Sequence, residues 1–243
     1  MRLALYNQMF AFNGKSFFSN LAAHWTVHFQ SKKEKVWEKM NIGRTLEIVK
    51  KSNADIIGIC EIVEGQEKEL KIGLKKLGYN YVYFGEGHRT KFNKLMIQVA
   101  IASKFRLTKI EVKDFPKINE LGGGGGIIHC YCPKLKLHVF NIHFAIMQKK
   151  ELQQNQMNFL KKYLSKINKN TILMGDFNQS SSNINFPGMN LVSDGIKTCS
   201  LTPIFRNFHF QDDDHIFVKG LKKTNLGFIE GYSDHRLIYV DLE

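Results

Sequence analysis

Short apolar runs separated by turn residues dominate the pattern of hydrophobic and polar positions along the 243-residue chain. Each run is brief and rich in β-branched or aromatic side chains, which is typical of strands rather than helices. The pattern therefore predicts strands at residues 3–6, 56–60, 79–84, 97–102, 127–132, 137–142, 171–174, 216–218 and 237–240.

Helical spacing of apolar residues occurs in three places. Residues 152–167 carry an apolar stripe with lysines opposite, residues 70–78 carry leucines and end in a glycine stop, and residues 31–51 are less regular. Many strands and few helices indicate two stacked sheets flanked by helices, a layered α/β architecture rather than a simple alternating doubly wound one. The length is suited to one domain over residues 1–243.

Composition adds a packed interior and a positive surface to this picture. Apolar residues make up 43% of the chain and aromatic residues 12%, with only four prolines, which argues against disorder and for a packed interior. Lysine and arginine outnumber aspartate and glutamate by 35 to 22, a formal net charge of +13. Such a surface attracts nucleic acid, anionic lipid headgroups or phosphorylated small molecules. The alternative is a lysine-rich solubilising surface, because the lysines form no long block.

Cysteine usage and hydropathy bear on the compartment. Cys130 and Cys132 lie two apart on a predicted strand, and no second close pair or Cys/His array completes a zinc site. With Cys60 and Cys199 they are interpreted as reduced, buried thiols. The first ten residues lack the features of a signal peptide, and no apolar stretch is long enough to span a membrane. We expect a cytoplasmic, soluble monomer.

Two segments stand apart from the strand pattern. The glycine run at residues 122–126 lacks the Lys-Ser/Thr of a nucleotide-binding loop, so a turn or bulge before the next strand is favoured over a phosphate cradle. Residues 8–30 carry six aromatic rings among small and polar residues. These rings are expected to form the core of a small helical cap, with an aromatic wall for stacking bases or holding an apolar leaving group as the alternative.

Polar groups that a core-building strand does not need recur at the ends of the predicted strands. Taken singly, an asparagine there is a turn former, a histidine is a surface residue, and the acidic run at residues 212–214 is a solvated loop. Their recurrence at successive strand ends indicates one shared site, since open α/β folds keep their chemistry there. The candidates are Asn7, Glu61, Asn141 with His143, Asp176 with Asn178, Asp214, and Asp234 with His235.

This inventory is suited to cleavage of a phosphoester. Carboxylates are hard oxygen ligands for Mg²⁺ or Mn²⁺, which neutralises charge on the phosphate and on the leaving oxygen. An acid or base readies water for in-line attack, while neutral amide and imidazole donors stabilise the anionic oxygens.

Six short motifs, in order along essentially the whole chain, resemble the endonuclease/exonuclease/phosphatase superfamily with the DNase I-like fold. Two match outright, Gly175-Asp176-Phe177-Asn178 and Ser233-Asp234-His235. The others resemble the family patterns: Asn7 after the first strand, Glu61 at the end of residues 55–61, Asn141-Ile142-His143, and Asp214-His215-Ile216-Phe217.

The resemblance implies a four-layer α/β/β/α sandwich of two packed mixed β-sheets flanked by helices. It also implies a divalent-metal-dependent phosphoesterase using Mg²⁺ or Mn²⁺, which we expect to be a nuclease or phosphodiesterase acting on DNA or RNA. The alternative is a phosphatase or phospholipase C-type enzyme acting on inositol phosphate, sphingomyelin or another small or lipid phosphate ester. A catalytically dead nucleic-acid-binding relative is disfavoured, because no key group is missing.

The resemblance also implies roles for individual residues. Glu61 is expected to be the main metal ligand, with Asn7 and Asp234 completing or supporting the metal site. The catalytic residues implied are His235 for acid/base or phosphate contact, Asp214 to orient it, Asp176 and Asn178 to position water, and His143 to stabilise the phosphate or leaving group.

Two positions depart from the family pattern. Cys60 stands where a glutamine often precedes the metal-binding glutamate, and Met9 stands where some members have a second aspartate on the metal side. The number of metal ions therefore stays open. His143 argues against the exonuclease III-type abasic-site endonucleases, which generally have a tyrosine motif there.

Overall fold

Two mixed β-sheets form the centre of the computed structural model, which describes residues 1–12, 17–200 and 211–243. In the first sheet β1 and β2 run parallel and the other neighbours pair antiparallel. Its strand order is β11 (Lys223–Ile229), β12 (Leu237–Leu242), β1 (Arg2–Asn7), β2 (Ile56–Val63), β4 (Met96–Ser103) and β3 (Tyr81–Arg89).

The second sheet has one parallel pair, β7 with β8, among antiparallel neighbours. A single pairing, Glu86 with Ile127, links it to β3 of the first sheet. Its strands are β6 (Gly126–Cys132), β7 (Leu137–His143), β8 (Asn170–Asp176), β10 (Asp214–Lys219) and β9 (Asn190–Leu191), with β5 (Thr108–Ile110) beside β6.

The two sheets bury one apolar face of each against the other. Leu5 of β1 and Val99 of β4 lie in the same buried cluster as Val139 of β7 and Ile216 of β10. Successive side chains of a strand point to opposite faces, so the intervening residues reach the outer faces and need a cover of their own.

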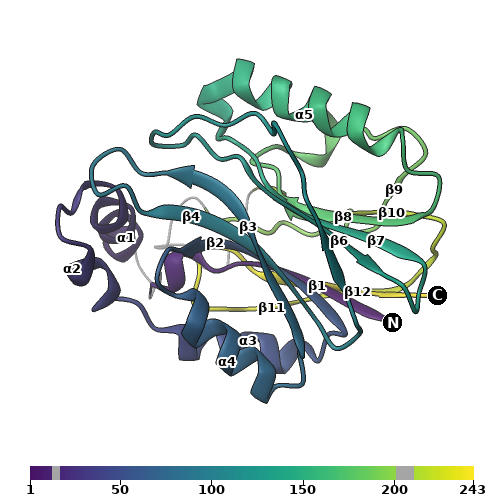
Figure 1. Ribbon diagram of the computed structural model, residues 1–243, viewed down its shortest axis with the longest axis horizontal. Coiled ribbons are helices and arrows are strands. Elements are labelled where there is room, and N and C mark those ends of the chain that lie inside the picture. The colour runs from purple at the N-terminus through teal and green to yellow at the C-terminus, as the bar shows by residue number, and fades with distance from the viewer. Residues whose placement is uncertain (13–16, 201–210) are drawn as a thin grey trace.

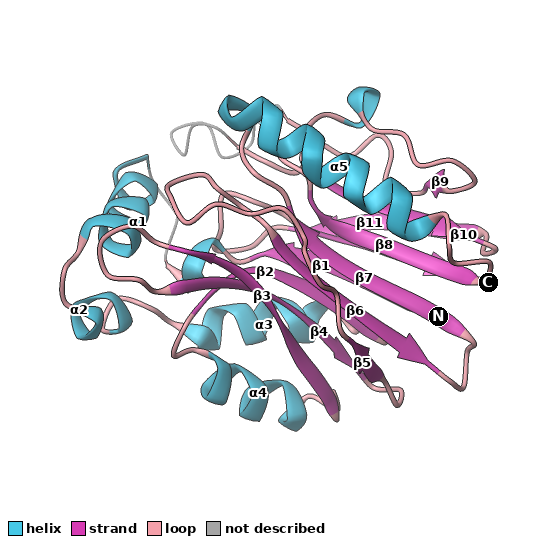
Figure 2. Ribbon diagram, turned by 45° about the horizontal axis from the view of Figure 1, so that its top comes forward, coloured by secondary structure: helices cyan, strands magenta, loops and turns pink. Residues whose placement is uncertain are grey.

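Helices supply that cover on both sides. α3 (Ile42–Ser52) and α4 (Glu67–Lys76) lie on the first sheet, where Ile48 and Leu74 join its outer-face core. α5 (Lys150–Leu164) lies on the second sheet, where Leu160 packs with the phenylalanine cluster. Figures 1 and 2 show the helices on opposite outer sides of the sheets. The predicted four-layer α/β/β/α sandwich is confirmed.

A helical cap covers one end of the sandwich, at the left of Figure 1. It comprises the short helix η1 (Met9–Ala11), α1 (Phe17–Phe29) and α2 (Lys33–Trp37). Phe10 and Phe12 pack with Ala23 and Val27 of α1 in a small separate core, as the predicted cap requires. Trp25 and Phe29 do not join this core and are 63% and 39% exposed, so the prediction that they form part of it is wrong. Part of the predicted segment 8–30 lies outside the described residues, namely residues 13–16. The rings of Phe17 and Phe18 also lie outside the side chains that the structure describes.

Three strands, β5, β9 and β11, escaped prediction. All three bury few side chains, so they carry little of the apolar signal on which the prediction depends. Two further short helices, η2 (Met147–Lys149) and η3 (Ser181–Asn183), connect other elements. All four cysteines are free and buried, as expected. None of the described helices has the length and apolar character needed to cross a membrane.

Asn141 corrects one expectation about the strand ends. Its side chain is fully buried between the sheets, and its Nδ2 donates to the carbonyl oxygens of Ile59 at 3.0 Å and Ala100 at 2.9 Å. The Cys60 thiol contacts the Asn141 Oδ1 at 3.6 Å. Asn141 therefore joins the two sheets and does not belong to the candidate site. Its side chain points into the core between the sheets, whereas the candidate site lies at the end of β7.

Candidate active site

Three neighbouring strands of the second sheet place polar side chains at the same edge. β7 and β8 are parallel and end together, with His143 paired in register with Asp176. β10 runs the other way and begins where they end, with Asp214 opposite Asp176. Asn7 ends β1 of the first sheet, so the site draws on both sheets. The strand register thus gathers residues that are far apart in the sequence.

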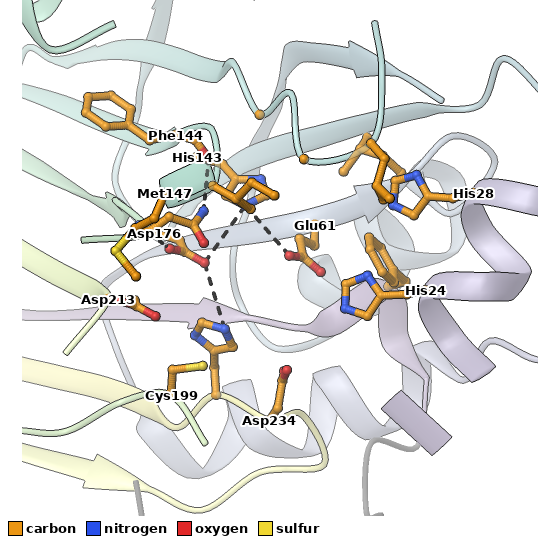
Figure 3. A pocket seen from close by; sticks show the side chains of 18 of the residues that line it. His24, His28, Glu61, His143, Phe144, Met147, Asp176, Cys199, Asp213 and Asp234 are labelled. Carbon is orange, nitrogen blue, oxygen red and sulfur yellow. Dashed lines mark hydrogen bonds and ion pairs between the residues drawn. The ribbon is translucent and has the colours of Figure 1, made fainter. Parts of the chain in front are cut away.

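Asp176 is the centre of this arrangement. Its Oδ2 accepts a hydrogen bond of 2.8 Å from Asn7 Nδ2, and its Oδ1 accepts one of 2.8 Å from the backbone N–H of Asn178. The Nε2 atoms of His143 and His235 each lie 3.9 Å from Asp176 Oδ2. Figure 3 shows the dashed contacts converging on this carboxylate. One buried carboxylate is therefore shared by an amide and two imidazoles.

Glu61 lies on a β-bulge rather than at the strand end that the sequence predicted. The pairing of β2 with β4 shifts register between Ile59 and Ile62, and Glu61 has a φ of 57°, which is unfavourable for a residue other than glycine. The bulge turns the carboxylate toward the site, where Oε1 lies 3.2 Å from Asn7 Nδ2 and 3.7 Å from His143 Nε2. Backbone strain at such a position is typical of functional sites.

The environment of Glu61 fits a divalent cation. Its Oε2 is buried and has no hydrogen-bond partner among the described residues, and burial, reinforced by Asp234, raises the pKa of the carboxyl to about 8. A buried carboxylate in this state is stabilised by a cation. Ligand atoms of Glu61, His143 and Asp176 lie within 4.8 Å of one another, as a shared metal requires. The carboxylate oxygens of Glu61 and Asp176 are hard donors, which suit Mg²⁺ or Mn²⁺.

His235 forms a short pair with Asp214, whose Oδ2 lies 2.6 Å from its Nδ1. Burial lowers the pKa of His235, but the opposite effect of Cys199 and Asp214 is larger. The net pKa of His235 is well above the ordinary value of 6.5. Burial also raises the pKa of the Cys199 thiol to about 12, so this thiol is neutral near pH 7. The carboxylate of Asp214 therefore supplies the charge that keeps His235 protonated.

Asn178 and Asp234 complete the predicted set. Asn178 follows β8 with a φ of 50°, and its Nδ2 donates to the backbone oxygen of Phe144 at 3.0 Å. The Asp234 carboxylate accepts a 3.1 Å hydrogen bond from Ser233 and faces the same cleft as Glu61 (Figure 3). The structure brings together all eight residues: Asn7, Glu61, His143, Asp176, Asn178, Asp214, Asp234 and His235.

A cleft of about 720 Å³ opens above these residues. Its floor carries the carboxylates and imidazoles, whereas its walls are mostly apolar and come from α1, the loop before β6 and the segment after β7. Among the described lining residues there is no lysine or arginine. The cleft is thus acidic at its floor and apolar toward its mouth.

Several cleft residues were missed from the sequence. Asp213 lines the cleft, and burial together with Asp176 raises its pKa to about 7. Its place in an acidic run, beside Asp214, was the available signal. Cys199 also lines the cleft next to His235. His24 and His28 lie four apart on α1, which is the spacing that puts two side chains on one helix face.

The fold and the site together define a four-layer α/β sandwich that gathers carboxylates and imidazoles at one end of its two sheets. A family model described as the Endonuclease/Exonuclease/phosphatase family matches residues 40–235. The chain belongs to this family, as its motifs predicted. No curated protein sequence matches the chain.

Solved structures share the fold at low sequence identity. An endonuclease/exonuclease/phosphatase family protein from Leptotrichia buccalis C-1013-b is 17% identical with a TM-score of 0.66, covering 100% of this chain and 99% of that one. The mannosyl-6-phosphatase Bt3783 of Bacteroides thetaiotaomicron VPI-5482 is 16% identical with a TM-score of 0.63, covering 100% and 99%. D. rerio TDP2 complexed with a single-strand DNA product is 14% identical with a TM-score of 0.64, covering 100% and 98%.

Proposed function

We propose that this chain is a divalent-metal-dependent hydrolase of phosphoesters. One observation carries the proposal: a buried oxygen of Glu61, which no described residue hydrogen-bonds, lies beside a carboxylate, Asp176, that two imidazoles approach to 3.9 Å. A cation bound by Glu61 would neutralise charge on a phosphate group. The neighbouring groups suit the handling of water and phosphate oxygens.

In this proposal the residues of the chain divide the reaction between them. Asp176 and Asn178 hold a water molecule, and Asp176 takes its proton as the water oxygen bonds to phosphorus. The bond from phosphorus to the leaving oxygen breaks, and that oxygen takes a proton from solvent, to which Asp176 later returns the proton that it accepted. Protonated His235, fixed by Asp214, and His143 donate hydrogen bonds to the phosphate oxygens.

The metal would be held mainly by Glu61, with Asp234 facing the same space. Asn7 acts as a support, because its Nδ2 donates to both Glu61 and Asp176 while its Oδ1 accepts from the backbone N–H of Met9 at 3.0 Å. Met9 itself is buried in the core of the cap. In this arrangement position 9 adds no ligand, which favours a single metal ion.

Two substrate classes are candidates for this site, and the net charge favours the first, nucleic acid. The formal net charge of +13 attracts a polyanion, and TDP2, which shares the fold, was solved with a single-strand DNA product. The second candidate is a small or lipid-borne phosphate ester. It is favoured by the apolar walls of the cleft and by the lack of lysine and arginine among its described lining residues.

Metal-dependent turnover tests the reaction independently of the natural substrate. Purified protein is assayed with bis-p-nitrophenyl phosphate, single- and double-stranded DNA, RNA, inositol phosphates and phospholipid vesicles, with Mg²⁺ or Mn²⁺ and with chelator. We expect release of product only with metal, and losses of about 10²-fold or more in Asp176→Asn and His235→Ala. No metal-dependent turnover of any substrate would refute the proposal.

Matched variants separate chemistry from folding. Asp194→Asn removes an exposed carboxylate outside the cleft lining, and His138→Ala removes an imidazole at the opposite end of β7 from His143. Both are expected to keep the turnover of the unmodified protein. Equal losses in Asp194→Asn and Asp176→Asn would point to a general loss of folding instead of a catalytic role.

A further inference from the structure

Exposed apolar side chains gather around the mouth of the cleft. Leu21, Trp25 and Phe29 project from α1, with Trp25 63% exposed and Leu21 56% exposed. Leu121 and Met147 face them from the loop before β6 and from η2. Of the ten large apolar residues exposed in the described part of the chain, these five line this one cleft.

Phe92 extends this apolar rim beyond the cleft lining. It is 58% exposed in the turn between β3 and β4, and its ring lies 5.4 Å from that of Phe29, which in turn stacks on Trp25 at 4.8 Å. The rim is defined as Leu21, Trp25, Phe29, Phe92, Leu121 and Met147. Exposing so much apolar surface around one opening is unfavourable in water and marks an interaction surface.

Exposed lysines border the rim in the sequence. Lys91 and Lys94 flank Phe92, Lys32 follows the end of α1, and Lys150 follows Met147. Apolar side chains bordered by lysines are typical of proteins that lie on an anionic lipid surface, where the rings enter the headgroup region and the ammonium groups contact lipid phosphates.

The composition of the rim favours lipid over nucleic acid. Single-stranded nucleic acid stacks its bases on aromatic rings and needs cations along a groove that follows the backbone. Here half of the rim, Leu21, Leu121 and Met147, is aliphatic or thioether and offers no stacking surface. The described cleft lining also has no lysine or arginine to follow a polynucleotide backbone.

We propose that the rim docks on an anionic phospholipid bilayer and that the site below it hydrolyses a headgroup phosphoester. A water oxygen bonds to phosphorus, the bond from phosphorus to the glycerol oxygen of the lipid breaks, and the phosphorylated headgroup is released while the protonated glycerol oxygen stays with the diacylglycerol. This assignment rests on the proposed phosphoesterase function and names its substrate class. The acyl chains would stay among the rim residues, and the headgroup phosphate would reach Glu61, Asp176 and His235 at the cleft floor. The apolar walls of the cleft then surround the lipid in place of the water that would surround a soluble phosphate ester.

Tryptophan fluorescence reports docking directly. The chain has two tryptophans, Trp25 and Trp37, so Trp37→Phe leaves the rim residue as the sole reporter. We expect a blue shift of Trp25 emission and quenching by brominated acyl chains with vesicles of phosphatidylglycerol and phosphatidylcholine. Weaker binding is expected with phosphatidylcholine alone. No shift with either vesicle would overturn the proposal.

Rim variants in this background test the surface itself. Phe92→Ser and Leu121→Ser should each weaken vesicle binding by about tenfold, because each removes buried apolar area from the docked state. Ile72→Ser is the matched control, since Ile72 is 47% exposed on α4 and lies outside the cleft lining. Equal effects of all three substitutions would remove the rim from the proposal.

Measurements of turnover distinguish the proposed lipid substrate from the proposed phosphoesterase activity. With metal, the ratio of headgroup release from vesicles to hydrolysis of bis-p-nitrophenyl phosphate should fall in the rim variants and stay constant in Ile72→Ser. Hydrolysis of the soluble diester without any release from bound vesicles would overturn lipid as substrate and leave the phosphoesterase intact. A Trp25 shift with single-stranded DNA but not with vesicles would assign the rim to nucleic acid.

Discussion

The hydrogen bond between His235 Nδ1 and Asp214 Oδ2, at 2.6 Å, decides what this histidine is able to do. It fixes the ring orientation, so Nε2 is directed toward Asp176. It also raises the pKa of His235 by placing a buried carboxylate against it, in opposition to the effect of burial. The pair therefore supplies a protonated, oriented donor at neutral pH.

Asp214→Asn tests that pairing. The amide keeps the size of the side chain but loses the charge that favours imidazolium, so turnover should fall by about 10²-fold or more with little change in KM. The pH profile should also change, with the limb assigned to His235 moving to lower pH. Steady-state kinetics across pH measure both effects. An unchanged profile would show that Asp214 has only a structural role.

Gly124 is required by its neighbours rather than by flexibility. It has a φ of +56°, and a Cβ there would lie 2.3 Å from the carbonyl carbon of Phe144, directly after His143. The predicted turn in the glycine run therefore packs tightly on the end of β7. Its role is to hold the loop beside the site.

Gly124→Ala should cost about 2 kcal/mol or more of unfolding free energy, because it adds a backbone clash to an unfavourable φ. Gly188→Ala is the matched control. Gly188 also has a positive φ, +75°, but no atom of the residues that the structure describes lies within 4 Å of its added Cβ, so about 1 kcal/mol is expected. Urea denaturation measures both. Equal costs would mean that the backbone of Phe144 yields easily.

At the scale of elements, α1 has two functions in one helix. Its inner residues Ala23 and Val27 anchor the cap, while Trp25 faces the cleft mouth. The inner side of the cap also buries imidazoles: His28 stacks toward His88 of β3 with ring centroids 6.5 Å apart. Within the described part of the chain, neither His28 Nδ1 nor either ring nitrogen of His88 has a hydrogen-bond partner.

These histidines make the cap sensitive to acid. Burial lowers the pKa of His28 to about 4 and that of His88 to about 3, from an ordinary value of 6.5. The unfolded chain binds protons below pH 6.5 while the folded chain does not, so this contribution to stability is present above 6.5 and is lost as the pH falls toward 4 and 3.

His28→Gln should flatten this dependence. The slope of the unfolding free energy between pH 6.5 and 4 should decrease by up to about 1.4 kcal/mol per pH unit. Denaturant unfolding at several pH values measures it, and His88→Gln provides an independent second case. Parallel curves for both variants and the unmodified protein would contradict the assignment.

The sequence pattern predicted best those helices and strands that bury many apolar side chains. The central strands and α5 have strongly periodic apolar residues and were predicted, whereas β11 is mostly exposed and was not. The bulge at Glu61 was not predicted from the sequence, for a different reason. Its positive φ results from pairing between β2 and β4, which no local pattern of residues encodes.

At the scale of the whole molecule, the sequence predicts which residues form the candidate site but not how they are arranged, because the arrangement depends on the packing of the two sheets. Short motifs identified all eight, because the chemistry needs those residue types at strand ends. The contacts that give them roles, such as Asn7 bridging Glu61 and Asp176, join residues from opposite sheets. Asn141 was misassigned for the same reason, since only packing of the sheets shows that it faces inward.

Metal binding should stabilise the whole molecule, because Glu61 and the groups around it are assembled only in the folded chain. At a metal concentration about 100 times Kd, the unfolding free energy should rise by about 2.7 kcal/mol. For a chain of this length that corresponds to an increase in Tm of about 5–10 °C.

Thermal unfolding with Mn²⁺ or Mg²⁺, and then with excess chelator, measures this shift without any substrate. Glu61→Gln keeps the shape of the side chain but removes the ligand charge, so it should abolish the shift, and Glu86→Gln, on an exposed carboxylate of β3, should retain it. Without metal, Glu61→Gln should be as stable as the unmodified protein or more stable, because the amide replaces a carboxyl whose ionisation is disfavoured by burial and by Asp234. A metal-induced shift that survives in Glu61→Gln would place the ion elsewhere in the fold.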